Sequence, residues 1–274
     1  MPSLRVDLAA GRSVTFSVAE PGPISDTCFV LGVRKCGSSI MNSLVIALAK
    51  LNKRHFLDVA GTFFKEDVAE REWRTDPAAL PLFIPGQVHG GFRGMAPIMQ
   101  QSPVWAPARK ILLVRDPRDA LVSEYFSVAY THSVPVAQAE TGGVRTEFLA
   151  AREMALQTSL EDYVLAKAAS LDSTITGYAD VARDPHTKLF RYEDVILRKR
   201  DWVRAMAKHF GWTAGSEDYL DKVMGWADVL PQTERPDQFI RRVTPGDHKE
   251  KLRPAVVEHL NARLAKSMAL FGYR

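Results

Sequence analysis

The stretch CFVLGVRKCGSS, residues 28–39, decides how the rest of the chain is interpreted. Its first six residues form a short, continuous apolar run, which is typical of a strand buried in a parallel sheet. A polar loop with a second glycine follows, and residues 40–51 then show the apolar spacing of a helix. A strand, a glycine loop and a helix in this order begin a βαβ unit. The stretch therefore predicts an α/β fold.

The remaining pattern supports a single α/β domain over residues 26–274. Further strand-like runs lie at 55–60, 110–114 and 187–192, and a helix is expected to begin at Pro117. Residues 61–107, rich in Pro, Gly and aromatics, predict short helices and loops. We expect a central, mainly parallel sheet flanked by helices, with the helical patterns at 145–170, 198–210, 216–226 and 253–270.

Residues 1–25 alternate polar and apolar side chains on both sides of Gly11 and end in a Pro-Gly-Pro linker. This pattern predicts an N-terminal β-hairpin extension, which could add an edge to the central sheet.

The composition excludes several classes of protein. The 274 residues are 46% hydrophobic and 25% charged, as in globular proteins, and the net charge is only +4. That excess suits an anionic small ligand better than nucleic acid, which needs a denser basic stripe. Cys28 and Cys36 alone can form neither a disulfide framework nor a zinc site, so we expect no metal. With no signal-peptide core and no apolar window of about 20 residues, a cytoplasmic protein without a transmembrane segment is expected.

The loop at 32–39 is a candidate anion site. Gly32 and Gly37 have the spacing of a nucleotide P-loop, at the start of a helix where backbone N–H groups hold anions. Ser38 and Ser39 stand where an NTPase has Lys-[Ser/Thr], and the lysine lies inside the loop at 35. Such a lysine can neutralise a leaving group beside a 5′-phosphate. The alternative is an ordinary glycine turn with a surface lysine.

Two further stretches could bind a second phosphate. Arg115 follows a predicted strand, where open α/β sheets place their ligands, and Ser123 lies about two helical turns later. An arginine and a hydroxyl suit a phosphate; the alternative is an ion pair with Asp116 or Asp119. The stretch RRVTPGDHK, residues 241–249, is a basic loop that could fold over a polyanion or simply be solvated.

Together these stretches resemble the family of sulfotransferases that use 3′-phosphoadenosine-5′-phosphosulfate (PAPS). The family loop reads roughly Pro-Lys-[Ser/Ala]-Gly-Thr-Thr-Trp, and residues 34–40 read RKCGSSI. The 3′-phosphate element, Arg-[Asn/Asp]-Pro-x-Asp with a later Ser, is matched by RDPRD at 115–119 with Ser123. Residues 241–249 are similar to the C-terminal loop Arg-Lys-Gly-x-x-Gly-Asp-Trp-Lys, and the family's Arg-Tyr-Glu-Asp stands at 191–194. The resemblance spans residues 29–249.

The resemblance implies a P-loop-like sulfotransferase fold and in-line transfer of a sulfuryl group from PAPS to a hydroxyl or amine. The products would be the sulfated acceptor and adenosine 3′,5′-bisphosphate (PAP), and no metal would be required. Lys35 would be catalytic, at the leaving group. The residues implied for nucleotide binding are Arg34, Lys35, Cys36, Gly37, Ser38, Ser39, Arg115, Ser123, Tyr192, Arg241, Arg242 and Gly246.

The general base is assigned by a weaker match. In the cytosolic branch of the family a histidine stands in a Lys-x-His-Leu-Pro context, and the nearest match here is QVHGG at 87–91. We therefore predict His89 as the base, with Glu66 or Asp67 as the next candidates. The remaining histidines considered, including His132, have sufficient structural explanations.

Departures from the family pattern suggest a divergent, bacterial branch. Ile40 stands where many members carry a tryptophan that stacks on adenine, and Val243 and His248 replace a Gly and a Trp. What holds adenine therefore stays open. The acceptor also stays open among small molecules such as alcohols and phenols, carbohydrates and lipid-linked glycans. The rival interpretations are a P-loop nucleotide kinase or NTPase using ATP and Mg²⁺, and a catalytically inactive PAP-binding protein.

Overall fold

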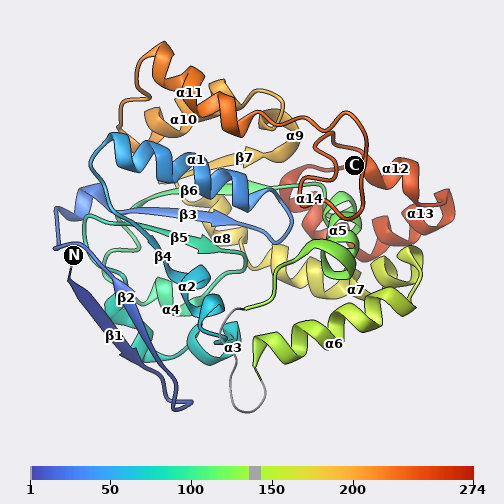
Figure 1. The fold of residues 1–274 in the computed structure, drawn as a ribbon, viewed down its shortest axis with the longest axis horizontal. Coiled ribbons are helices and arrows are strands. Elements are labelled where there is room, and N and C mark those ends of the chain that lie inside the picture. The colour runs from blue at the N-terminus through green and yellow to red at the C-terminus, as the bar shows by residue number, and fades with distance from the viewer. Residues whose placement is uncertain (1, 136–142) are drawn as a thin grey trace.

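A five-stranded parallel sheet forms the centre of the molecule (Figure 1). The computed structural model describes residues 2–135 and 143–274. In the order β4-β5-β3-β6-β7, the strands are β4 (Phe56–Asp58), β5 (Val88–Phe92), β3 (Cys28–Gly32), β6 (Arg109–Val114) and β7 (Thr187–Arg191). The predicted α/β class with a parallel sheet is confirmed.

Helices cover both faces of this sheet. On one face α1 (Ser38–Leu51), α10 (Lys199–Phe210) and α11 (Glu217–Ala227) pack on one another, and on the other lie α2 (Val59–Lys65), α4 (Pro97–Gln100) and α8 (Ala179–Arg183) (Figure 1). Because both faces are covered, every residue of β3 is buried. This two-sided burial explains why the strand is a continuous apolar run rather than an alternating one.

A helical layer lies beyond the carboxyl ends of the strands (Figure 1). There α5 (Pro117–Phe126) packs on α7 (Leu160–Thr176) and α12 (Asp247–Lys251), while α13 (Pro254–Arg263) and α14 (Ala265–Phe271) pack on α7. A π-helix, η3 (Ser127–Thr131), continues α5 and contacts α6 (Val144–Gln157). The shorter elements are η1 (Ile24–Asp26), α3 (Glu70–Trp73), η2 (Pro77–Leu82) and α9 (Tyr192–Val195).

Three predicted elements differ from the structure. The expected helix at 145–170 is divided into α6 and α7, because Ser159 caps α7 by accepting the N–H of Asp162 at 3.2 Å. The helix expected at 253–270 is divided at Leu264. The strand β5 was missed because it contains Gly90 and Gly91. A Cβ at position 90 would lie 2.1 Å from the ring of Phe56, so packing requires glycine there.

The N-terminal hairpin is present, with β1 (Ser3–Asp7) antiparallel to β2 (Ser13–Ser17). It forms a two-stranded sheet of its own, so the expectation of an added edge on the central sheet was wrong. Its inner side chains enter the main core, where the ring of Phe16 meets Phe63 edge-on at 4.9 Å. The division into an extension over 1–25 and a domain over 26–274 stays a prediction.

Candidate active site

The loop between β3 and α1 contains Lys35 and leads directly into the first turn of α1. Lys35 has a left-handed backbone (φ 64°), and Gly37, with φ 93°, caps α1. A Cβ at position 37 would lie 2.9 Å from the ring of Tyr192, so glycine is required for both its φ and its close contact. Helix α1 begins at Ser38, and its first N–H groups have no partner within the helix. The loop therefore combines an ammonium group with the positive end of a helix dipole.

Arg115 follows the neighbouring strand β6 and is directed toward the same loop. Its Nη1 donates to the carbonyl of Lys35 at 3.4 Å, and its guanidinium lies over the ring of Tyr192 at 4.4 Å. Nη2 is 3.7 Å from Asp119, whereas Asp116 is taken by Arg118 at 2.6 Å. Within the described chain, the buried Nε of Arg115 has no hydrogen-bond partner. A donor left unsatisfied in this way is suited to an anionic ligand.

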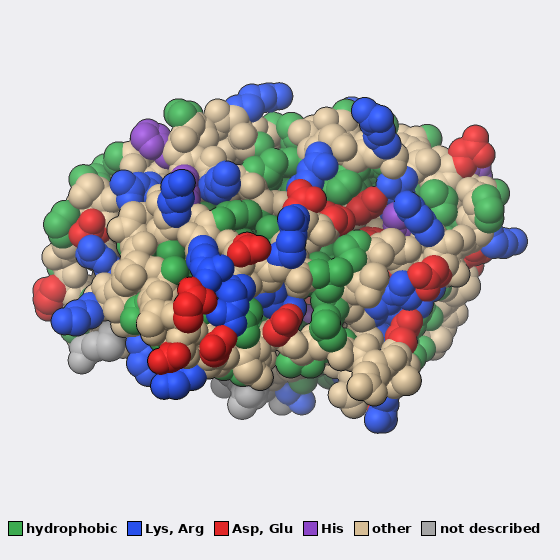
Figure 2. Space-filling model, turned by 90° about the horizontal axis from the view of Figure 1, so that it is seen from above, with side chains coloured by type: hydrophobic (Ala, Val, Ile, Leu, Met, Phe, Trp, Pro, Cys, Tyr) green, Lys and Arg blue, Asp and Glu red, His purple; other side chains and the backbone are tan. Residues whose placement is uncertain are grey.

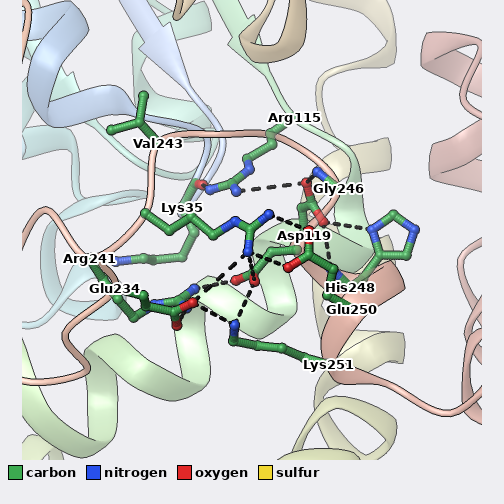
Figure 3. A network of polar contacts seen from close by, with 12 residues as sticks. Lys35, Arg115, Asp119, Glu234, Arg241, Val243, Gly246, His248, Glu250 and Lys251 are labelled. Carbon is green, nitrogen blue, oxygen red and sulfur yellow. Dashed lines mark hydrogen bonds and ion pairs between the residues drawn. The ribbon is translucent and has the colours of Figure 1, made fainter. Parts of the chain in front are cut away.

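Asp119 on α5 anchors the loop at 241–249 (Figure 3). Its carboxylate accepts the N–H of Gly246 at 2.7 Å and of His248 at 2.9 Å, and contacts Nδ1 of His248 at 2.6 Å. Burial alone would raise the pKa of Asp119, but the His248 bond and the charge of Arg115 hold that pKa well below its ordinary value. The carboxylate is thus ionised and fixes the loop beside the strand ends.

Carboxylates contact both arginines of this loop, and Figure 3 shows Arg241 beside Glu234. The guanidinium of Arg241 lies over the ring of Phe126 at 4.1 Å and pairs with Asp247 and Glu234. Arg242 binds both oxygens of Glu250, each at 2.5 Å. Glu234 also accepts from Lys251 at 2.7 Å. Carboxylates therefore contact the cations that an incoming phosphate would use.

Cations from both predicted phosphate sites, Lys35 from the first and Arg115, Arg241 and Arg242 from the second, line one small cavity of about 40 Å³. Its lining is Lys35, Arg115, Ser123, Phe126, Ser127, Thr131, Pro236, Gln238, Phe239, Arg241 and Arg242. Burial, followed by the charge of Arg93, lowers the pKa of Lys35 to about 8, with Arg115 and Arg34 adding to the effect. Cations crowded against one another favour the binding of an anion.

The other predicted nucleotide-binding residues lie around this cavity without lining it. Arg34 is directed to Glu124, with 3.4 Å between Nη1 and Oε1. Cys36 is fully buried, and burial raises the pKa of its thiol to about 12. Tyr192 donates its hydroxyl to the carbonyl of Val243 at 2.8 Å. Ser38 and Ser39 form the first turn of α1, and Gly246 donates to Asp119.

The structure does not bring His89 into this group. The imidazole is completely buried in β5, stacked on Phe29 with 4.9 Å between ring centroids, and burial lowers its pKa to about 4. Glu66 is exposed, and Asp67 is buried with Oδ1 accepting the N–H of Arg145 at 2.7 Å. None of the three predicted bases lines the cavity. The role assigned to His89 from the sequence stays a prediction.

Sequence reasoning also missed cavity residues. Ser127 and Thr131 line the cavity because the π-helix η3 places them there, and no sequence pattern signals a π-helix. Pro236, Gln238 and Phe239 come from an irregular segment before the basic loop. Asp119 stood in the quoted motif, where its spacing from Arg115 was the only signal for its anchoring role.

Comparison with known proteins decides the family. A family model described as the sulfotransferase domain matches residues 95–272. The chain belongs to the sulfotransferase family. The resemblance drawn from the sequence is thereby confirmed, and this sulfotransferase is an enzyme.

Solved structures support the sulfotransferase fold. The mouse sulfotransferase SULT7A1 complexed with PAP aligns with a TM-score of 0.58 and 11% identity, over 98% of this chain and 99% of that one. Retinol dehydratase in a complex with retinol and PAP aligns with a TM-score of 0.52 and 13% identity, over 97% and 90%. At such identities the likeness shows the fold alone. No curated protein sequence matches the sulfotransferase.

The described residues contain neither a helix that could span a membrane nor a cluster that could hold a metal ion, and one face of the surface shows how charge is distributed. Across residues 2–135 and 143–274, no helix is long and apolar enough to span a membrane, and no three His, Cys, Asp or Glu side chains gather to hold a metal ion. On the face shown in Figure 2, Lys and Arg side chains are interspersed with Asp and Glu. That face therefore presents no continuous basic stripe.

Proposed function

We propose that this sulfotransferase takes PAPS as its donor, transfers the sulfuryl group to a hydroxyl or amine of a small molecule, and releases PAP. The observation that carries the proposal is the single cavity shared by Lys35, Arg115 and Arg241. These cations come from three distant parts of the chain, and they meet beyond the carboxyl ends of β3 and β6. Open α/β sheets bind nucleotides in this position. Both aligned solved structures are described with PAP.

Each phosphate would have its own set of groups. The 5′-phosphate would lie at the start of α1, held by N–H groups from Gly37 to Ser39, the hydroxyls of Ser38 and Ser39, and Lys35. The 3′-phosphate would lie against Arg115, Ser123, Arg241 and Arg242, with the Gly246 backbone beside it. Arg34 would flank the loop. An enzyme that used ATP and Mg²⁺ would have no need of the second set.

Adenine is proposed to occupy a second cavity of about 320 Å³. Leu197, Leu230 and Val243 supply aliphatic walls, and Gln232 and Thr244 are polar residues among its lining. It shares Arg241 and Arg242 with the first cavity, so a nucleotide could extend from one to the other. The side chain of Ile40 packs with Tyr192, Ile196 and Val243. An aliphatic pocket would then replace the tryptophan that stacks on adenine elsewhere in the family.

The chemistry is a displacement at sulfur. The acceptor oxygen forms a bond to sulfur while the bond from sulfur to the 5′-phosphate oxygen breaks, and that oxygen keeps the electron pair. The ammonium of Lys35 stabilises the charge that develops there. The carboxylate of Glu234 pairs with Arg241, so donor binding must exchange this carboxylate for phosphate.

The proposal is tested by titrating PAP calorimetrically into the wild type, Arg115→Ala and Arg109→Ala. Arg109 begins β6 and donates to the carbonyl of Phe210 at 2.6 Å, so its variant removes an arginine from the opposite end of the same strand. We expect micromolar PAP binding that Arg115→Ala abolishes and Arg109→Ala retains, with ATP and Mg²⁺ inert. A preference for ATP and Mg²⁺, or no PAP binding, would overturn the proposal and favour the kinase interpretation.

The acceptor is proposed only by class. Alcohols, phenols, carbohydrates and lipid-linked glycans are all compatible, and a screen with labelled PAPS distinguishes them. PAP binding without transfer to any acceptor would favour the inactive PAP-binding interpretation. We also propose the cytoplasm as the compartment, because Cys28 and Cys36 are both free, buried thiols.

A further inference from the structure

The reaction needs a group that removes the acceptor's proton, and one histidine directly follows a cavity-lining residue in the chain. Thr131 lines the cavity together with Lys35, and His132 is the next residue, at the end of η3. Its backbone is fixed on both sides, because its N–H donates to Ser127 at 2.8 Å and its carbonyl accepts from Arg152. The imidazole is thus placed by helix geometry rather than by a free loop.

The hydrogen bonds of the ring define which nitrogen is available. Nδ1 of His132 lies 2.7 Å from the carbonyl of Ser133, and a carbonyl can only accept, so Nδ1 carries the hydrogen. Nε2 then holds the lone pair. In the described parts of the chain, Nε2 makes no hydrogen bond. The ring therefore offers a proton acceptor in the tautomer that a general base requires.

Aromatic neighbours hold the ring in an apolar wall. The ring centroid of His132 is 4.5 Å from that of Phe148 and 5.7 Å from that of Phe64, with interplanar angles of 31° and 70°. These rings come from α6 and α2, and they limit rotation of the imidazole. The imidazole therefore lies against an apolar surface.

Burial, and after it the cations nearby, keep the imidazole of His132 neutral. Burial lowers the pKa of the imidazole to about 4, against the hydrogen bond to Ser133, and the cations Lys35, Arg93 and Arg34 lower it further. Donor binding would bring negative charge to these cations and move the pKa back toward its ordinary value. At neutral pH the ring is unprotonated and can accept a proton.

We propose that His132, which follows the cavity-lining Thr131 at the end of η3, is the general base of the transfer. This inference rests on the proposed function. The acceptor O–H bond breaks and its proton passes to Nε2, while the oxygen bonds to sulfur and PAP leaves with the electron pair of the broken S–O bond. The imidazolium then releases the proton to solvent. His89, enclosed in the core, has no part in this step.

The tautomer tests the inference without an acceptor. In a ¹⁵N-histidine NMR spectrum of the PAP complex at pH 7, assigned by the signals that His132→Asn removes, we expect a proton on Nδ1 and none on Nε2. A ring protonated on Nε2 would overturn the proposal. Failure of PAP to bind the wild type would instead count against the proposed function itself.

Kinetics supply the second test, with labelled PAPS and either a phenol (2-naphthol) or an acceptor found in the screen. His132→Asn and His132→Gln should bind PAP like the wild type and lower kcat by about 100-fold or more. In a plot of kcat against pH, the fall in kcat at low pH should be absent from both His132 variants. His209→Gln is the matched control, because His209 also contacts a backbone carbonyl, that of Lys110 at 2.9 Å, away from the cavity. A kcat within threefold of the wild type in both His132 variants would overturn the proposal.

Discussion

Replacing Asp119 by asparagine should detach the loop at 241–249 and destabilise the fold. The carboxylate accepts two backbone N–H groups and contacts Nδ1 of His248, all within 2.9 Å and almost fully buried. Hydrogen bonds to a charged group contribute about 1.5–3 kcal/mol each, and an asparagine keeps only one carbonyl oxygen. The variant should therefore lose at least one strong bond, leave Arg115 less well paired, and unfold with a free energy about 3 kcal/mol lower.

The assay is urea denaturation at pH 7, followed by fluorescence, with Asp180→Asn as the control. Asp180 is 92% exposed and pairs loosely with Arg183 at 3.7 Å, so its variant should stay within about 0.5 kcal/mol of the wild type. The pKa of Asp119 is lowered on folding, so its contribution is present above the ordinary value of 3.8 and is lost as pH falls through the folded value. The difference between Asp119→Asn and the wild type should thus be constant from pH 5 to 8.

The same variant should weaken PAP binding by about tenfold or more, because the loop that carries Arg241 and Gly246 loses its anchor. An unfolding free energy within about 0.5 kcal/mol of the wild type would refute the reasoning, since the buried carboxylate would then contribute no more than an exposed one. Normal stability with weakened PAP binding would place the role of Asp119 in the charge of the site alone.

Three further changes have definite expected outcomes. Lys35→Ala should lower kcat by about 100–1,000-fold, and kcat/KM for PAPS in the wild type should fall above pH 8, where the ammonium of the free enzyme deprotonates; a level profile to pH 10 would contradict this. Glu234→Gln should tighten PAP binding by about threefold to tenfold in calorimetry, because it removes a carboxylate from Arg241, and weaker binding would show that Glu234 instead orients the arginine. Gly37→Ala should weaken PAP binding and lower the melting temperature, because of the φ of 93° and the contact with Tyr192; an unchanged thermal unfolding curve would contradict this.

The sequence predicted those parts of the fold that are set by local pattern. The strands β3 and β6 were recognisable because burial on both faces requires continuous apolar runs. The strand β5 was not recognisable, because it contains Gly90 and Gly91. Glycine is required there by close contacts with the ring of Phe56 and with Asp58, and these contacts form only in the folded chain. Likewise the break between α6 and α7 depends on a single cap at Ser159.

The candidate site also contains residues whose positions could be predicted from the sequence and residues whose positions could not. Lys35 and Arg115 directly follow strands, and parallel strands bring their carboxyl ends together, so their meeting could be predicted. The anchoring of Gly246 by Asp119 could not, because it joins residues 127 positions apart through a buried carboxylate. The position of His132 was also beyond prediction, since it depends on a π-helix and on aromatic contacts from α2 and α6.

Because of the π-helix η3, single-residue insertions and deletions would affect the side of the site near η3 but not the side that holds Lys35 and Arg115. Such a helix corresponds to an α-helix that has gained one residue, and each residue turns an α-helix by about 100°. Loss of one codon within 127–131 would rotate Thr131 away from the cavity and displace His132, while Lys35 and Arg115, which follow strands of the sheet, would keep their positions. Single-residue insertions and deletions here offer evolution a route to new acceptor chemistry on an unchanged donor site.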